Sequence, residues 1–100
     1  DDKIGELLEV LEEEGLRNDT VVIVTSDHGE MGGAHHLRQK GSVAFKETVN
    51  MPLVIVDPRR TGGQRTEAVG SHLDLVPTIL AYAGLSEEER RRRYPFLKGH

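Results

Sequence analysis

The sequence predicts an α/β fold, and three observations lead to that prediction. Two unbroken apolar runs, residues 21–24 (VVIV) and 51–56 (MPLVIV), are typical of strands buried on both faces, as in a parallel sheet covered by helices. Apolar residues at helical spacing precede the first run and follow the second. The resulting order of helix, strand, long loop, strand, helix and helix is that of an α/β protein.

The first helix is predicted from four apolar residues at positions i, i+3, i+4 and i+7, which are Ile4, Leu7, Leu8 and Leu11. Gly15 is expected to end this helix in a left-handed conformation, with Leu16 folding back onto it. Residues 17–19 then form a turn, and residues 20–25 form the first strand. The segment between the two strands is more than 20 residues long, contains four glycines and has no clear period. Loops of that length inside a compact domain are usually functional or disordered.

The C-terminal part of the chain predicts two helices. Asp74 is expected to be the N-cap of the first, with Pro77 tolerated in its first turn. Its apolar face holds Val76, Ile79, Leu80 and Ala83, and Gly84-Leu85 repeats the ending seen at Gly15-Leu16. The last helix, residues 86–93, has its acids first and its arginines last. Three pairs at i,i+4 predict a solvated, self-neutralised helix rather than an anion patch: Glu87/Arg91, Glu88/Arg92 and Glu89/Arg93.

Composition excludes several classes of function. The net charge of -4 argues against a nucleic-acid partner, because phosphate binding needs a surplus of Lys and Arg. The absence of cysteine excludes disulfides, thiolate metal sites and cysteine nucleophiles within these residues. No apolar run approaches the roughly 20 residues of a membrane span. Two doubly buried strands cannot protect their own edges, so we expect further strands from sequence upstream, or an oligomer formed through exposed sheet edges.

Asp27 and His28 are the first candidate site residues. They follow the carboxyl end of the first strand, which is where ligands bind in open α/β sheets. A carboxylate and a neutral imidazole suit divalent zinc, manganese or magnesium better than calcium. The pair can share a metal only if the chain turns there, and Gly29 allows a turn. The alternative is a turn-forming Asp beside a surface His.

The long loop carries His35, His36, Lys40 and Lys46. They could place a positive charge and hydrogen-bond donors over an anionic oxygen group. The alternative is a solvated polar loop. His72, just before Asp74, is interpreted as a structural histidine beside a helix start.

Four segments in order resemble the C-terminal part of the sulfatase catalytic domain, in the alkaline phosphatase superfamily. They are TSDHGE, GGAHHLRQKG, NMPLVIVDP and SHLDLVPTILAYAGL, and the likeness runs from Asp1 to about Leu85. The resemblance implies an alkaline-phosphatase-like three-layer sandwich, of which residues 1–100 are a C-terminal fragment. It also implies a metal-dependent hydrolase of small sulfate or phosphate esters.

Site roles follow from the same resemblance. Asp27 and His28 match ligands of a divalent cation, which could be calcium, manganese or zinc. Lys40 matches the lysine of a G-x-H-G-x-x-x-K-G loop that contacts the sulfate or phosphate. His35 matches the histidine of that loop, while His36 stands where the family usually has Gly, so either could face the substrate.

The family's nucleophile, a formylglycine made from a C/S-x-P-x-R motif, has no counterpart among these residues. Some relatives use an unmodified Ser or Thr instead. We therefore expect this chain alone to be inactive. The open alternatives for the whole protein are a phosphodiesterase, a phosphonate hydrolase, a phosphoglycerol transferase or a non-catalytic truncated member.

Overall fold

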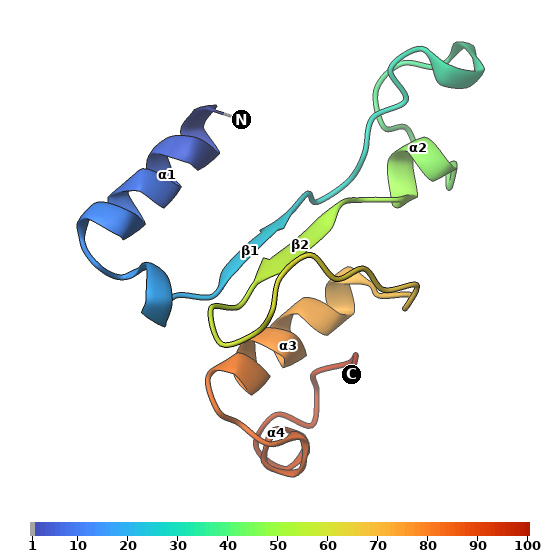
Figure 1. Cartoon of the computed structure of the whole chain (residues 1–100). Helices are drawn as coiled ribbons and strands as arrows, with labels where there is room; N and C mark the ends of the chain where they lie inside the picture. The colour runs from blue at the N-terminus through green and yellow to red at the C-terminus, as the bar shows by residue number, and fades with distance from the viewer. Residues whose placement is uncertain (1) are drawn as a thin grey trace. The chain divides into compact units, whose positions relative to one another are not determined.

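The computed structural model describes residues 2–100, which divide between residues 63 and 64 into two compact units. The first unit contains the helix α1 (Asp2–Glu13), the strands β1 (Val22–Thr25) and β2 (Leu53–Val56), and the short helix α2 (Lys46–Val49) (Figure 1). Two 3₁₀ turns, Arg17–Asp19 and Ala34–His36, interrupt its loops. The mixed α/β composition predicted from the sequence is therefore confirmed.

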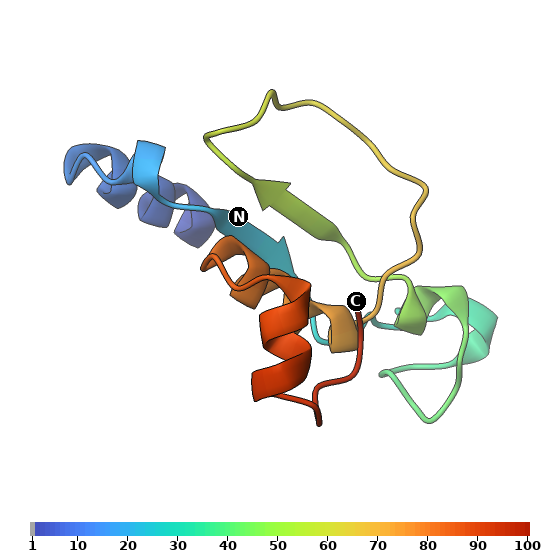
Figure 2. The same ribbon diagram turned by 90° about the horizontal axis from the view of Figure 1, so that it is seen from below.

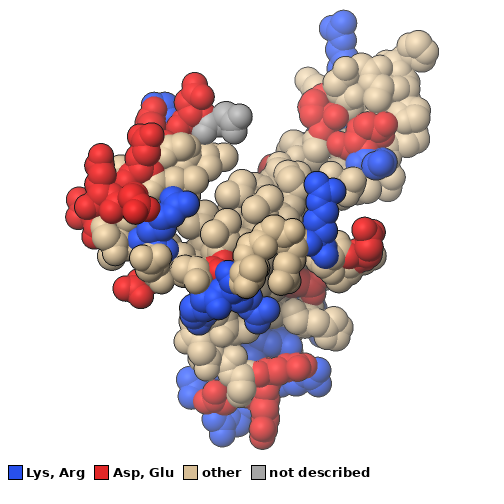
Figure 3. Space-filling view, viewed as in Figure 1, with Lys and Arg blue, Asp and Glu red and all other residues tan. Residues whose placement is uncertain are grey.

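The end of α1 follows the predicted design. Gly15 has φ +67°, and its N–H donates to the carbonyl of Glu12 over 3.0 Å. The N–H of Leu16 donates to the carbonyl of Leu11 over 2.9 Å. These two bonds form a Schellman motif, which satisfies carbonyls that the helix end would leave without partners. Acidic side chains cover the exposed face of this helix (Figure 3).

The two strands pair in the antiparallel sense, with Ile23 opposite Ile55, so the prediction of a parallel sheet is wrong. Figures 1 and 2 show the two arrows pointing in opposite directions. The segment between the strands carries only short turns and α2, and it leaves and re-enters the sheet at the same end. Parallel pairing would instead require a crossover to the other end of the sheet. An apolar run identifies a strand but does not encode its direction.

Burial on both faces of the strands is also not found among the described residues. β1 is half-buried or exposed, and all of β2 is exposed, from 37% for Ile55 to 52% for Leu53 and Val54. The most buried apolar side chain described is Met31, which is 3% exposed and lies in the loop after β1. The two strands therefore present apolar surface to solvent.

The second unit contains the 3₁₀ turn His72–Asp74, α3 (Leu75–Tyr82) and α4 (Glu87–Arg93). Asp74 is the N-cap residue of α3, as predicted, but its side chain caps no N–H of α3. It bonds instead to Ser71, the N-cap of the preceding 3₁₀ turn. Ser71 Oγ accepts the N–H of Leu73 over 3.2 Å, and Asp74 Oδ2 accepts the N–H of Ser71 over 2.7 Å. This reciprocal capping box begins the 3₁₀ turn that directly precedes α3. Pro77 lies buried in the first turn of α3, as predicted.

The end of α3 and most of α4 agree with the sequence. Gly84 has φ +91° and, with Leu85, forms a second Schellman motif. Ser86 and Glu89 form a capping box at the start of α4. Two of the three expected ion pairs form, Glu87 with Arg91 and Glu89 with Arg93. The third expected ion pair, Glu88 with Arg92, does not form among the described residues.

Candidate active site

Asp27 and His28 lie in a tight turn directly after β1. Ser26 Oγ donates a hydrogen bond to the carbonyl of His28 over 2.7 Å, which closes the turn. Thr25 Oγ1 donates to the carbonyl of Pro52 over 2.8 Å, which ties the end of β1 to the residue before β2. These bonds fix the backbone from which the two side chains project.

The side chains of Asp27 and His28 converge. His28 Nδ1 lies 2.7 Å from the carbonyl oxygen of Gly29, and only a protonated Nδ1 can donate to that oxygen. In the neutral ring, the lone pair is then on Nε2, and Nε2 lies 3.4 Å from Oδ2 of Asp27. The backbone N–H of His28 donates to Oδ1 of Asp27 over 3.0 Å, which holds the carboxylate in this orientation.

This arrangement fits a divalent cation. Metal bonds of about 2.0–2.2 Å place neighbouring ligand atoms roughly 3–3.5 Å apart, close to the separation of Nε2 and Oδ2. A histidine ligand commonly donates its other ring N–H to a backbone carbonyl, as Nδ1 does here. Both side chains are accessible, with 85% of Asp27 and 39% of His28 exposed. Among the described residues, however, no group of three or more His, Asp or Glu side chains could hold a metal ion together.

Neighbouring groups lower the pKa of the Asp27 carboxyl below its ordinary value. The charge of His28 contributes most to lowering the pKa of Asp27, and the hydrogen bond from the backbone N–H of His28 lowers it further. Lys40 makes a smaller contribution in the same direction. Lys40 is therefore close enough to interact electrostatically with Asp27, although the two residues are 13 positions apart in the sequence.

Gly29 has a different role from the one expected. Its φ is not in the left-handed region, so glycine is not required for the turn. Instead, its N–H donates to the carbonyl of Thr48 in α2 over 3.0 Å. A Cβ at this position would lie 1.9 Å from the carbonyl oxygen of Glu47. Gly29 is needed because the backbone after β1 packs directly against the backbone of α2.

The loop 31–40 is held by its own backbone. Ala34 N–H donates to the carbonyl of Met31 over 2.8 Å, and Gly33 N–H donates to the carbonyl of Leu37 over 3.0 Å. Three residues other than glycine have positive φ in this loop: His35 (52°), His36 (60°) and Gln39 (62°). Such conformations are uncommon for residues with a side chain and often occur at functional sites.

His35 is the histidine that the surrounding structure holds. Its ring stacks on Phe45 with centroids 4.2 Å apart and planes inclined by 14°. Its Nε2 lies 3.6 Å from a carboxylate oxygen of Glu47. Among the described residues, His36 makes no side-chain hydrogen bond, ion pair or ring contact. Phe45 and Glu47 were not identified from the sequence, although a phenylalanine in a polar loop is unusual in a chain with 4% aromatic residues.

The helix α2 contacts both parts of the candidate site, which are the turn after β1 and the segment that carries Phe45. Thr48 is 6% exposed, and its hydroxyl contacts the carbonyls of Val43 and Phe45, each over 2.8 Å. Its carbonyl accepts the N–H of Gly29, so one residue links the turn of Asp27 and His28 to the segment that carries Phe45. His72 lies in the second unit, exposed, at the start of a 3₁₀ turn.

Comparison with known proteins identifies the family. The family model named Sulfatase matches residues 1–85. The chain belongs to the sulfatase family. It is 43% identical over 89 residues to an uncharacterised sulfatase, YidJ, of Escherichia coli, which covers 89% of this chain and 18% of YidJ. No solved structure gives a significant match.

Other relatives carry different names. The chain is 41% identical over 87 residues to PehA of Trinickia caryophylli, a multifunctional alkaline phosphatase superfamily protein, covering 84% of this chain and 16% of PehA. It is 39% identical over 85 residues to arylsulfatase K of Xenopus laevis, covering 85% of this chain and 16% of that protein. The chain thus spans less than a fifth of the length of these relatives. Within residues 2–100, no helix is long and apolar enough to cross a membrane.

Proposed function

We propose that residues 1–100 are the C-terminal part of a sulfatase catalytic domain and that the whole protein hydrolyses sulfate esters. The convergence of Asp27 Oδ2 and His28 Nε2, 3.4 Å apart in a chain of this family, carries the proposal. In the whole protein we expect a three-layer, alkaline-phosphatase-like sandwich in which further strands and helices cover the apolar faces of β1 and β2. Such covering elements explain why the apolar sequence of β2 is typical of a buried strand, although β2 is exposed in residues 1–100.

Asp27 and His28 would hold a divalent cation, which could be calcium, manganese or zinc, together with ligands from other parts of the protein. When bound, such a cation polarises the ester and stabilises negative charge near the reacting atom. The bond from His28 Nδ1 to Gly29 fixes the ring so that Nε2 can serve as the ligand atom. The lowered pKa of Asp27 keeps its carboxylate ionised and available.

Lys40 and His35 would act on the ester itself. The ammonium group of Lys40 neutralises charge that builds on the nonbridging oxygens. His35 is suited to hold a proton for the leaving oxygen, because Phe45 and Glu47 fix its ring in one orientation. His36 is the alternative donor, but it has no such support. The formylglycine, Ser or Thr nucleophile would come from outside residues 1–100.

The test is hydrolysis by the whole protein of 4-nitrophenyl sulfate in the presence of calcium, manganese or zinc. Lys40→Ala should lower kcat/KM by about 10²–10³, the range for loss of one group that stabilises transition-state charge. Lys3→Ala, in α1 with a side chain that is 85% exposed, is the matched control and should change kcat/KM little. Activity that survives Lys40→Ala would contradict the role of Lys40. An inactive whole protein would favour a non-catalytic member.

A second candidate is hydrolysis or transfer of phosphate or phosphonate esters. The 41% identity to the multifunctional protein PehA favours it. The resemblance drawn from the sequence favours it as well, because His28 resembles the position that is His in phosphonate hydrolases and phosphoglycerol transferases of the superfamily. Rates on bis(4-nitrophenyl) phosphate and on a phenylphosphonate ester, measured beside the sulfate ester, rank the two candidates. A higher kcat/KM for either phosphorus ester would overturn the assignment to sulfate.

We further propose that residues 1–100 in isolation self-associate through the strands. Among the described residues each strand has one edge that pairs with no other strand, and β2 exposes four apolar side chains. Size-exclusion chromatography should show dimers or larger species that increase with concentration. Replacing Ile55 by Lys should shift the chain to the monomer, whereas an unchanged elution volume would count against this contact.

A further inference from the structure

Arg90 differs from the other arginines of α4. Arg91, Arg92 and Arg93 each follow a glutamate by four residues, but Arg90 follows Ser86. The hydroxyl of Ser86 is occupied in the capping box, where it accepts the N–H of Glu89 over 3.2 Å. The helix therefore offers Arg90 no carboxylate partner at i−4.

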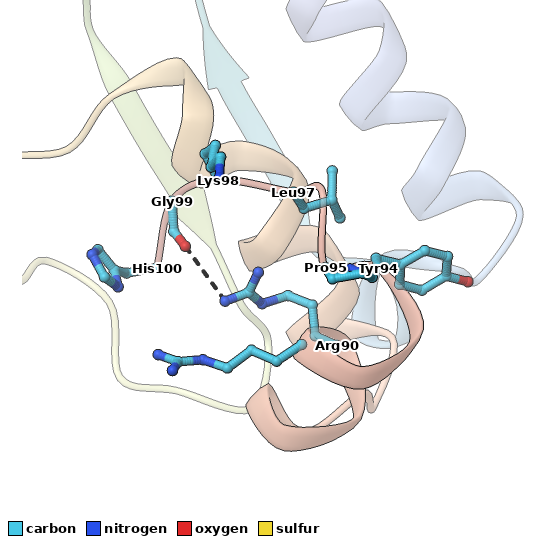
Figure 4. Close-up of a pocket in the computed structure, with 8 residues that line it drawn as sticks. Arg90, Tyr94, Pro95, Leu97, Lys98, Gly99 and His100 are labelled. Atoms are coloured by element: carbon cyan, nitrogen blue, oxygen red, sulfur yellow. Dashed lines mark hydrogen bonds between the residues drawn. The ribbon is translucent and has the colours of Figure 1, made fainter.

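Arg90 is also the buried member of the run. The residue is 6% exposed, whereas the side chains of Arg91 and Arg93 are 66% and 51% exposed. Its Nη2 donates to the carbonyl of Gly99 over 3.4 Å, near the upper limit of a hydrogen bond (Figure 4). A guanidinium group has five N–H donors, and burying a cation without a counter-charge is costly. Among residues 2–100, this long bond to a neutral carbonyl is the only hydrogen bond of the Arg90 side chain, so most of its donors are not used there.

A cavity lies beside this guanidinium. Its volume is about 540 Å³, and its lining includes Arg90, Arg91, Tyr94, Lys98, Gly99 and His100 (Figure 4). No acidic side chain is among its lining residues. Glu87 offsets the charge of Arg91, so Arg90 and Lys98 are the cations left to face the cavity. Its electrostatic character is therefore positive in a chain whose net charge is -4.

We propose that this cavity binds a tetrahedral oxyanion, a sulfate or phosphate group, with Arg90 as its principal ligand and Lys98 as a second cation. A planar guanidinium can donate two parallel N–H bonds to such a group, and the anion would supply the missing counter-charge. The site shares no residue with the candidate active site and does not depend on the proposed function. Inorganic sulfate or phosphate and a sulfate monoester share this chemistry, so the test includes both forms.

The test is a titration of the 100-residue chain followed by ¹⁵N–¹H NMR. Sodium sulfate, sodium phosphate and methyl sulfate are compared with sodium chloride at equal ionic strength. We expect saturable shifts confined to the Arg90 side chain and to amides 90–91 and 97–99. If only the inorganic ions give saturable shifts, the ligand is a free sulfate or phosphate ion. If methyl sulfate also gives saturable shifts, the site accepts an ester group as well. Shifts that do not saturate, or that match those in chloride, would overturn the proposal.

Three variants locate the ligand. Arg90→Gln should weaken binding roughly tenfold or more, the effect expected for loss of a charge-assisted pair. Arg92→Gln, on the exposed part of α4, is the matched control and should leave affinity unchanged. If Arg90→Gln does not fold, the exposed Lys98→Gln keeps the test open and should weaken binding severalfold. Equal affinity in the wild type and in every folded variant would refute the assignment of Arg90 and Lys98.

Discussion

Replacement of Gly29 by alanine tests the packing that positions the candidate metal ligands. The new Cβ would lie 1.9 Å from the carbonyl oxygen of Glu47, and 2.9 Å from its carbonyl carbon. Because Cβ contacts below 3.0 Å essentially never occur, one of the two backbones must retreat by about 1.1 Å. Both Glu47 atoms that the new Cβ would approach belong to the backbone, so no flexible side chain can move aside to relieve the contact.

The expected cost follows from this displacement. Overpacking a well-fitted position costs about 1–3 kcal/mol. The hydrogen bond from the N–H of Gly29 to the carbonyl of Thr48, now 3.0 Å long, would be stretched beyond hydrogen-bond range, and its loss adds about 1 kcal/mol. We therefore expect Gly29→Ala to lower the free energy of unfolding by about 2–4 kcal/mol.

Urea unfolding followed by circular dichroism measures the free-energy change. Hydrogen exchange at the amide of position 29 reports whether the bond to Thr48 persists. Gly62→Ala is the matched control, because no atom lies within 4 Å of its added Cβ and its φ is not in the left-handed region. If the Gly29 variant unfolds within about 0.5 kcal/mol of this control and keeps its amide protection, the close approach to α2 is refuted.

Three further predictions concern stability. Gly15→Ala should destabilise the chain by about 1 kcal/mol, because φ at Gly15 is +67°. Gly5→Ala, inside α1, should instead stabilise the chain by about 0.5–1 kcal/mol. Urea midpoints of the two variants that move in the same direction would contradict this pair of predictions. Ser71→Ala removes a capping-box hydroxyl and should cost about 1 kcal/mol, with faster exchange of the Leu73 amide as the local readout. Hydrogen bonds from Arg59 lower the pKa of Asp57 below its ordinary value of 3.8, so the stability that Asp57 contributes should be fully present above that pH and be lost as the pH falls through the lowered pKa. The difference in urea midpoint between the wild type and Asp57→Asn should then be constant at neutral pH and vanish in strong acid, and a difference that grows in acid would refute the sign.

The sequence predicted best those features that depend on neighbouring residues. The endings at Gly15-Leu16 and Gly84-Leu85 were predicted and confirmed, because a glycine after an apolar helical stripe determines a Schellman motif locally. Asp74 was predicted as the N-cap of α3 and has that position, but its side chain belongs to the capping box of the preceding 3₁₀ turn. Ser71 and Asp74 both have capping side chains, and the pattern alone did not show that they act together as a capping box.

Features that depend on distant residues were not predictable in the same way. The direction of β2 is decided by where the chain re-enters the sheet after the long loop, and the apolar run is the same in either direction. Exposure of β2 likewise depends on what covers the strand and not on its own residues. In the candidate site, Asp27, His28, His35 and Lys40 were identified from the sequence and its resemblance to sulfatases. Phe45 and Glu47 were missed, because their contacts with His35 depend on how the loop folds back.

The most direct test of the metal site is paramagnetic broadening by Mn²⁺ in ¹⁵N–¹H spectra of the chain, which detects weak binding by two ligands. Substoichiometric Mn²⁺ should broaden amides 26–29 first, because Asp27 Oδ2 and His28 Nε2 face one another across 3.4 Å. Asp27→Asn should abolish this selective broadening, and Asp19→Asn, also exposed, should leave it intact. Broadening that begins instead on the acidic face of α1, or that persists in Asp27→Asn, would contradict the assignment of Asp27 and His28 as metal ligands.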